Sequence, residues 1–358
     1  MDLQTEHRII CGDSRSMNAI RDSSINLVVT SPPYPMIAMW DELFTKMNPQ
    51  ISNVIGSDGT RAFELMHEEL DKTWKEIARV MIPGGIVCIN IGDATRKIGD
   101  TFSIYPNHSR ITMKMIELGF EALPEIIWHK QSNAPNKFMG SGMLPGGAYV
   151  TLEHEYILIF RKPGKRVYDK DIRSKSAYFW EERNIWFSDI WDFKGVKQKM
   201  TSESRERSAA FPCELPKRLI LMYSQYGDTV LDPFLGTGTT TNAAIVFGRN
   251  SVGYEIDQGL VDRCKNNATE IVSQYGMSNA HRLQHHKEFI INRIETGKEV
   301  KHVNGAYDIP VITSQECSIE LPFVKEVEMK GDSIIVHYAL TVEQDNRIIK
   351  GTNQMTLF

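Results

Sequence analysis

The chain has 358 residues, of which 41% are hydrophobic and 9% aromatic, and its formal net charge is −4. A chain of this length can bury a sizeable core, and its mild negative charge argues against nucleic-acid contacts over the whole surface. No apolar run approaches the roughly 18 to 20 residues of a membrane helix. The N-terminal residues also lack a basic region followed by a hydrophobic stretch, so we expect a cytoplasmic protein with no membrane partner.

The cysteines of the chain are odd in number, widely separated, and form no C-x-x-C pair. This spacing predicts neither a disulfide framework nor a zinc site, and we expect no metal. The simplest interpretation is buried, reduced thiols at Cys11, Cys88, Cys213, Cys264 and Cys317.

Short apolar runs bounded by turn residues alternate with amphipathic segments along most of the chain. The apolar runs predict buried strands at 8–11, 25–30, 85–91, 125–130, 155–160, 229–234 and 251–256. The amphipathic segments predict helices at 61–80, 108–118, 215–226, 239–248 and 258–274. This alternation is typical of an α/β fold, so we expect a wound sheet of about seven strands.

Other stretches do not follow this alternation. The composition of residues 35–60 and 131–149 predicts mobile loops. Residues 161–207 hold thirteen Lys and Arg against eight Asp and Glu, and the surrounding segment is rich in aromatic side chains. This local excess of positive charge suggests DNA, with a solvated basic loop as an equal alternative. The tail after about residue 275 has two or three strand-like runs and no chemistry that we can identify.

The first motif with chemical meaning is VLDPFLGTGTT, residues 230–240, in which an apolar run and an acid precede two glycines at the start of a predicted helix. Glycines let the backbone turn sharply and approach a ligand, and the free N–H groups of a helix start favour polar or negative ligand groups. Glu255 ends the next predicted strand, where an acid grips ribose hydroxyls in nucleotide-binding folds. The spacing fits neither the dinucleotide motif G-x-G-x-x-G nor a phosphate-binding loop.

The second motif is TSPPYPM, residues 30–36, directly after a predicted strand. Two prolines make a rigid turn whose carbonyl groups can accept hydrogen bonds, beside a hydroxyl at Ser31 and an aromatic face at Tyr34. An exocyclic amine that donates to Ser31 and to the carbonyl of Pro32 would present its lone pair to a methyl donor, while Tyr34 stacks on a flipped base. Catalysis would then rest on positioning and on stabilising developing positive charge. A proline-rich surface turn is the structural alternative.

Together the two motifs resemble the amino-methyltransferase family of bacterial and archaeal DNA modification enzymes, in which S/D/N-P-P-Y is catalytic and D-P-F-x-G-[ST]-G-T-T binds S-adenosyl-L-methionine. The catalytic motif comes first here, as in the permuted beta group, and the resemblance covers residues 7–274. It implies a circularly permuted, Rossmann-like methyltransferase fold with a mixed seven-stranded sheet in a catalytic domain at 1–274, followed by a C-terminal extension at 275–358. The serine form favours N4 of cytosine as the target, with N6 of adenine as the alternative.

The resemblance also implies roles for individual residues. It implies a catalytic segment made of Ser31, Pro32, Pro33 and Tyr34. It implies cofactor contacts from Asp13, Phe211, Pro212, Asp232, Pro233, Phe234, Gly236, Thr237, Gly238, Thr239, Thr240 and Glu255. Asp13 would contact the amine of the cofactor adenine, and Phe211 and Pro212 would hold its methionine end. The family commonly has a histidine shortly before this last segment, and the present chain lacks it.

The implied partner is double-stranded DNA, and pairing with a restriction endonuclease that cuts the same site is a hypothesis. Only residues 162–183 are free to be the family's target-recognition insert, so base readout would be shared with loops 35–60 and 131–149 and with the tail. The candidates for phosphate or guanine contacts are Lys137, Lys165, Arg166, Arg173 and Lys175.

Three other functions compete with this hypothesis. Methylation at C5 of cytosine needs a cysteine nucleophile, but Cys213 precedes the cofactor strand, whereas the nucleophile should follow the strand that ends in Ser-Pro-Pro-Tyr. Enzymes that methylate RNA bases or protein glutamine use a related tetrapeptide and stay open as alternatives. An inactive DNA-binding module is disfavoured because both motifs are intact.

Overall fold

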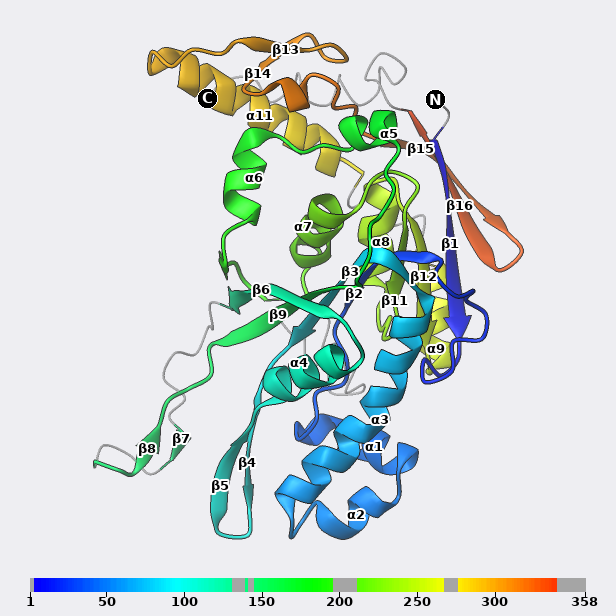
Figure 1. Ribbon diagram of the computed structural model, residues 1–358, viewed down its shortest axis with the longest axis vertical. Helices are drawn as coiled ribbons and strands as arrows, with labels where there is room; N and C mark the ends of the chain where they lie inside the picture. The colour runs from blue at the N-terminus through cyan, green and yellow to red at the C-terminus, as the bar shows by residue number, and fades with distance from the viewer. Residues whose placement is uncertain (1–2, 131–138, 141–144, 196–210, 267–275, 340–358) are drawn as a thin grey trace.

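The computed structural model describes residues 3–130, 139–140, 145–195, 211–266 and 276–339, which form an α/β structure around a central sheet (Figure 1). The sheet has ten strands in the spatial order β10-β6-β9-β3-β2-β11-β12-β1-β16-β15. Their bounds are β10 (Ile190–Asp192), β6 (Glu121–His129), β9 (His154–Arg161), β3 (Met81–Ile91), β2 (Ile25–Thr30), β11 (Thr229–Asp232), β12 (Asn250–Glu255), β1 (Leu3–Cys11), β16 (Ser333–Ala339) and β15 (Phe323–Lys330).

Five neighbouring strands, β3, β2, β11, β12 and β1, run parallel. Strand β9 runs antiparallel between β3 and β6, and β16 runs antiparallel to β1. The sheet is therefore mixed. Because parallel strands end at the same edge, the segments that follow β1, β2, β11 and β12 meet there.

The two faces of the sheet are covered by different helices. Val28 of β2 packs into one apolar cluster with Trp74 of α3 (Gly59–Val80) and Ile111 of α4 (Asn107–Glu117). Leu27 and Val29 pack into the other cluster with α7 (Glu214–Tyr223) and α8 (Thr239–Val246). Side chains alternate between the faces of a strand, so a strand covered on both faces reads as a continuous apolar run.

All seven predicted strands occupy the centre of the sheet, from β6 to β1, and the predicted α/β class is confirmed. The predicted number of strands is wrong. Strand β10 extends one edge, and β16 and β15, from the C-terminal extension, continue the other. The extension also contains α11 (Ser278–Glu295), β13 (His302–Asn304) and β14 (Ile309–Val311). Strands β15 and β16 of the extension therefore join the same sheet as the rest of the chain, whereas β13 and β14 form a separate two-stranded sheet.

The predicted loop at 35–60 is instead helical. It contains the short 3-10 helix Ala38–Trp40, α1 (Asp41–Met47) and α2 (Gln50–Val54), and it buries Phe44 and Ile51 completely. Two hairpins that the sequence did not predict follow further along the chain, β4 (Ala94–Ile98) with β5 (Thr101–Tyr105), and β7 (Met139–Gly140) with β8 (Ala148–Tyr149). Figure 1 shows α1 and both hairpins at the lower end of the molecule.

Segment 162–183 lies at the opposite end. It contains α5 (Lys170–Lys175) and the start of α6 (Trp180–Trp186), and Figure 1 shows α5 at the upper end beside the beginning of β1. Arg166 forms a buried ion pair with Asp228, while Lys175 contacts Asp171 and Glu320. Lys137 lies outside the described residues.

The sequence predicted that Arg166 meets DNA, whereas in the fold its guanidinium is desolvated and paired with Asp228. Arg173 lies over the ring of Tyr168, and Lys165 is exposed on the same segment. At least one of the basic residues of this segment, Arg166, therefore neutralises a buried acid, Asp228.

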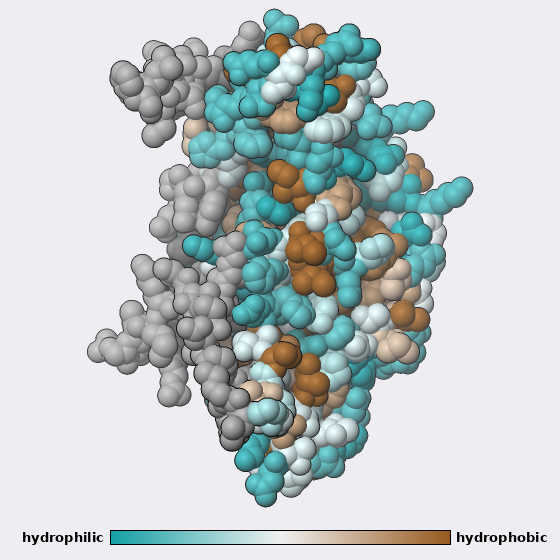
Figure 2. All heavy atoms as spheres, turned by 90° about the vertical axis from the view of Figure 1, so that its left-hand side faces the viewer, coloured by the Kyte–Doolittle hydropathy of each residue, from teal (hydrophilic) through white to brown (hydrophobic). Residues whose placement is uncertain are grey.

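Among the described residues that Figure 2 shows, apolar patches are small and separated by hydrophilic side chains. No helix in the described ranges is both long and apolar enough to cross a bilayer. All five cysteines are free thiols; Cys88 and Cys264 are buried as predicted, whereas Cys11 is exposed.

We predict that Arg166→Met lowers the free energy of unfolding by about 3 kcal/mol, because it leaves Asp228 buried without its cation. Urea denaturation measures this loss, and DNA affinity should stay unchanged. Lys165→Met, at an exposed neighbour, is the matched control for stability and should leave the free energy of unfolding unchanged. A loss of DNA affinity in Arg166→Met at full stability would restore the contact that the sequence predicted.

Candidate active site

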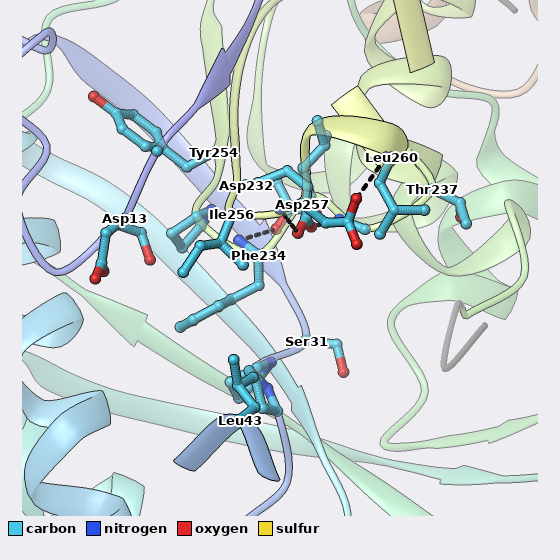
Figure 3. A pocket seen from close by; sticks show the side chains of 18 of the residues that line it. Asp13, Ser31, Leu43, Asp232, Phe234, Thr237, Tyr254, Ile256, Asp257 and Leu260 are labelled. Atoms are coloured by element: carbon cyan, nitrogen blue, oxygen red, sulfur yellow. Dashed lines mark hydrogen bonds between the residues drawn. The ribbon is translucent and has the colours of Figure 1, made fainter. Parts of the chain in front are cut away.

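A pocket opens where β1, β2, β11 and β12 end, at the sheet edge predicted to hold both motifs (Figure 3). In this view Phe234 lies near the centre, with Asp13 to its left and Thr237 to its right. The predicted residues that line the pocket are Asp13, Ser31, Pro32, Pro33, Phe211, Asp232, Pro233, Phe234, Gly236, Thr237, Thr239 and Glu255. The two motifs, about 200 residues apart in the chain, thus share one cavity.

The Ser-Pro-Pro-Tyr segment leaves the end of β2 directly into the pocket wall. Pro32 and Pro33 are buried, which proline tolerates because it has no N–H group that needs a partner. Just before them, the hydroxyl of Thr30 donates a 2.6 Å hydrogen bond to Asp232 at the end of β11. This bond fixes the tetrapeptide against the start of the glycine turn.

Tyr34, the last residue of the tetrapeptide, belongs to a network of polar side chains. Its hydroxyl donates to Glu155 over 3.0 Å and accepts from Ser31 over 3.1 Å and from Asn90 over 2.9 Å. Burial, together with the nearby carboxylate of Glu155, raises the pKa of Tyr34 well above its ordinary value, so the phenol stays protonated. The residue as a whole is half-buried, and it is the one member of the predicted catalytic segment that does not line the pocket.

The network residues Asn90, Lys130 and Glu155 were missed by the sequence analysis. Lys130, just after β6, forms an ion pair with Glu155 at the start of β9, and Asn90 lies near the end of β3. Asn90 interrupts an otherwise apolar strand run, and Glu155 stands at the start of another. A charged or amide side chain inside such a run is the signal that could have found them, since buried polar groups need partners.

The glycine turn connects β11 to α8. Gly236 and Gly238 have positive φ angles of 53° and 82°, and Gly238 caps the start of α8. Side chains with a Cβ atom rarely adopt this left-handed region, which explains the glycines. Glu255 braces the turn, since its two carboxylate oxygens accept from Gly236 N over 2.8 Å and from Asp257 N over 2.9 Å. Burial raises the pKa of Glu255 above its ordinary value.

Asp232 is almost fully buried and accepts hydrogen bonds from Thr30 and from the backbone of Phe234. Burial raises its pKa to about 6, because taking a carboxylate out of water disfavours its charged form and the hydrogen bonds only partly offset this cost. Asp232 therefore connects the ends of two strands by a hydrogen bond, and it also contributes to the lining of the pocket.

Asp13 lies on the pocket wall beyond β1 and is held by the guanidinium of Arg15, which also pairs with Glu69. Burial alone would raise the pKa of Asp13, but the hydrogen bonds and charge of Arg15 outweigh it and lower the pKa. The carboxylate is therefore ionised and fixed in position. Its accessible edge faces a cavity in which an adenine amine can donate to it.

Three predicted cofactor residues lie outside the pocket lining. Pro212 accepts from Leu215 N at the start of α7. Gly238 shapes the turn, and the buried hydroxyl of Thr240 donates to Val29 O over 3.2 Å. These three residues were predicted to contact the cofactor, and in the structure their own contacts are with the protein backbone.

Helix α1 supplies part of the lining that the sequence analysis missed. Leu43 and Met47 of α1 line the pocket together with Trp40, the residue directly before the helix, and their spacing of three and four residues places them on one side. Further along, β12 adds Tyr254, α9 (Gln258–Asn266) adds Leu260, and the connection between them adds Ile256 and Asp257. Segment 35–60 thus contributes an apolar wall to the site.

This combination of groups fits S-adenosyl-L-methionine. The apolar wall of Trp40, Leu43 and Phe234 suits a flat adenine ring. Glu255 and Asp257 line the pocket at the end of β12, and an acid at such a strand end meets ribose hydroxyls in nucleotide-binding folds. The acidic lining also complements a sulfonium cation, and the described lining contains no lysine or arginine that would repel it.

Comparison with known proteins agrees with this geometry. The family model described as DNA methylase, N6_N4_Mtase, matches residues 25–266, which is more than half of the chain. The chain belongs to this family. It is an S-adenosyl-L-methionine-dependent DNA methyltransferase that modifies an amino group.

The relatives of this DNA methyltransferase span most of its length. It is 52% identical over 327 residues to the type II methyltransferase M.MthZI of Methanothermobacter thermautotrophicus, covering 89% of this chain and 91% of the relative. It is 54% identical to the type II methyltransferase M.MjaI of Methanocaldococcus jannaschii over 73% of this chain and 90% of the relative.

Solved structures confirm the fold and the cofactor. TTHA0409 of Thermus thermophilus, crystallised with S-adenosyl-L-methionine, is 34% identical and has a TM-score of 0.59, covering 74% of this chain and 96% of its own. The PvuII DNA methyltransferase shares the fold with a TM-score of 0.52 at 18% identity. The methyltransferase fold predicted from the sequence is thereby confirmed.

The raised pKa of Asp232 predicts a pH-dependent stability. Between about pH 4 and pH 6, the unfolded chain releases this proton before the folded protein does, so ionisation destabilises the fold by about 3 kcal/mol. Asp232→Asn cannot ionise, and its stability relative to the wild type should rise by this amount between about pH 4 and pH 7. Urea denaturation of both proteins across this range measures the difference, and a constant difference would contradict the prediction.

Proposed function

We propose that the protein methylates N4 of cytosine at a specific sequence in double-stranded DNA, with N6 of adenine as the alternative base. The observation that carries the proposal is Ser31 at the first position of the tetrapeptide, facing the pocket. The serine form of this motif is the one that the family uses more often on cytosine. The type II names of the most similar relatives support action at a defined sequence.

In the proposed mechanism the target base leaves the duplex and enters beside Ser31. Its amine donates one hydrogen bond to the Ser31 hydroxyl and another to the carbonyl of Pro32, so that the nitrogen lone pair points into the pocket. The ring of Tyr34 packs against the base. Bound S-adenosyl-L-methionine supplies an electrophilic methyl group. Ser31 and Pro32 stabilise the positive charge that develops on the amine.

We further propose that the predicted lining residues hold the cofactor. Asp13 contacts the adenine amine, Glu255 the ribose hydroxyls, and Phe211 the methionine end. The turn between Asp232 and Thr240 presents its backbone N–H groups to the cofactor. The close fit of this turn at Gly238, where an added Cβ would lie 3.0 Å from Cys264 Sγ, offers a direct test.

Gly238→Ala should weaken S-adenosyl-L-methionine binding by at least about tenfold, because forcing alanine into the left-handed region costs about 1 to 2 kcal/mol and shifts the turn. Isothermal titration calorimetry measures the affinity. Gly297→Ala is the matched control, since Gly297 also has a positive φ angle, follows α11 and has open space around it. Equal affinities of the two variants would remove the turn from the cofactor site.

The base is identified by incubating the protein with bacterial genomic DNA and methyl-labelled S-adenosyl-L-methionine, then separating the nucleosides by mass spectrometry. We expect labelled N4-methylcytosine, reduced by at least about 100-fold in Ser31→Ala, as for other lost transition-state hydrogen bonds. N6-methyladenine would keep the mechanism and replace the base. Label on RNA or protein only, or none at all, would overturn the proposed substrate.

The proposed partner is a restriction endonuclease that cuts the same sequence. Methylated DNA from this experiment, once its modified sequence is mapped, should resist a nuclease of that specificity. Cleavage at fully modified sites would exclude the protective role while leaving the methylation itself intact.

A further inference from the structure

We propose that Glu155 receives the proton that the amine releases, through a relay formed by the hydroxyls of Ser31 and Tyr34. Glu155 is thereby the positioning residue that orients both hydroxyls before reaction. The proposal rests on the proposed contact between Ser31 and the amine, and it holds for cytosine and adenine alike.

The direction of the relay follows from the groups that surround Glu155. Its Oε1 pairs with Lys130, and its Oε2 accepts from Asn90 Nδ2 over 2.7 Å. An ionised carboxylate only accepts hydrogen bonds, so the Tyr34 hydroxyl, 3.0 Å away, must donate to it. The Tyr34 oxygen then accepts from Ser31, 3.1 Å away. The hydroxyl proton of Ser31 thus points away from the pocket. The lone pairs of Ser31 Oγ remain free to accept a hydrogen bond from an amine N–H.

Asn90 supports the same assignment. It is only 2% exposed, and within the described part of the chain its Oδ1 atom has no hydrogen-bond partner. An unpaired buried acceptor costs about 1 to 3 kcal/mol. The opposite amide orientation would place Oδ1 against Oε2 of Glu155, which also only accepts. The amide therefore directs its N–H groups to Tyr34 and Glu155, which marks both oxygens as acceptors.

Glu155 is a carboxylate buried at the start of an apolar strand. Glu155 is 8% exposed and begins a strand whose following residues, Ile157 to Phe160, are apolar and buried. Burying a carboxylate costs free energy that Lys130 offsets only in part. Gly92 packs against it, because a Cβ there would lie 3.1 Å from the Tyr34 ring and 3.2 Å from Glu155 Cγ. The backbone thus approaches Tyr34 and Glu155 closely enough to hold them in contact.

The chemical balance is complete within these groups. As the nitrogen bonds to the methyl carbon, the carbon–sulfur bond breaks and the sulfonium becomes a neutral thioether, so the positive charge moves to the nitrogen. One N–H proton then passes to Ser31 Oγ, the Ser31 proton passes to the Tyr34 oxygen, and the Tyr34 proton passes to Glu155. The methylated amine and both hydroxyls end neutral, and Glu155 ends as the neutral acid beside Lys130.

The test compares Glu155→Gln with the wild type in single-turnover methylation of a DNA fragment that contains the mapped sequence. Glutamine keeps an acceptor for Tyr34 but cannot take the proton. We expect the rate constant to fall by at least about 100-fold, the range of general acid–base catalysis. The dissociation constants of DNA and S-adenosyl-L-methionine should stay within about threefold, as measured by calorimetry and fluorescence anisotropy. Glu153→Gln, an exposed carboxylate two residues earlier, is the matched control.

Two further measurements separate a relay from a structural role. Tyr34→Phe, which keeps the ring and removes the middle of the relay, should show the same loss, and the double variant should be no slower than the slower single variant. If the losses in rate constant were additive in the double variant, the relay would be overturned. A wild-type rate constant in either single variant would overturn it too, as would a variant that only weakens the binding of DNA or S-adenosyl-L-methionine. If Glu155→Gln does not fold, Tyr34→Phe decides. If the variants lose rate in this way but the product of the wild type is N6-methyladenine, the proposed base is wrong and the relay stands.

Discussion

The hydrogen bond from Thr30 to Asp232 joins the two halves of the site. Both residues end parallel strands, and the pairing of Val28 with Leu231 brings these ends side by side. The Ser-Pro-Pro-Tyr turn and the glycine turn each leave the sheet at this point. The contact between the Thr30 hydroxyl and the Asp232 carboxylate therefore sets the distance between Ser31, which is proposed to hold the amine, and the glycine turn, which is proposed to hold the methyl donor. Asp232 is buried there at a cost in free energy, which indicates how strongly the site depends on that distance.

Much of the fold could be predicted from local patterns. Strand β2 has both faces covered, so it reads as an unbroken apolar run, and the other central strands follow the same rule. Helix α3 shows a wide apolar stripe over 22 residues. Segment 35–60 was mistaken for a loop because its helices have five and seven residues, too short for a clear periodicity. Strands β10, β16 and β15 were missed as members of the sheet, since the pairing of β10 with β6 and of β16 with β1 joins distant segments and leaves no local pattern.

The site likewise has a part that could be predicted from the sequence and a part that could not. Its two motifs are contiguous in sequence, and their chemistry could be inferred from residue types and spacing. The network around Glu155 depends instead on the antiparallel register in which Asn90 lies opposite Ile157, with Lys130 contributed by a third segment. Arg166 likewise has the sequence context of a surface cation, and only the fold brings Asp228, 62 residues away, against it. Partners at such separations are fixed by topology, which single-sequence patterns do not contain.

The pairing of β1 with β16 has a consequence for biosynthesis. Thr5 and Tyr338 are joined by a side-chain hydrogen bond across a separation of 333 residues. On the ribosome, β1 therefore emerges long before the strand that covers its free edge. Until then its unpaired N–H and C=O groups can pair with other chains, so nascent molecules pass through an aggregation-prone interval. Nonlocal closure of this kind also slows folding, and the rate at which β16 arrives limits completion of the sheet.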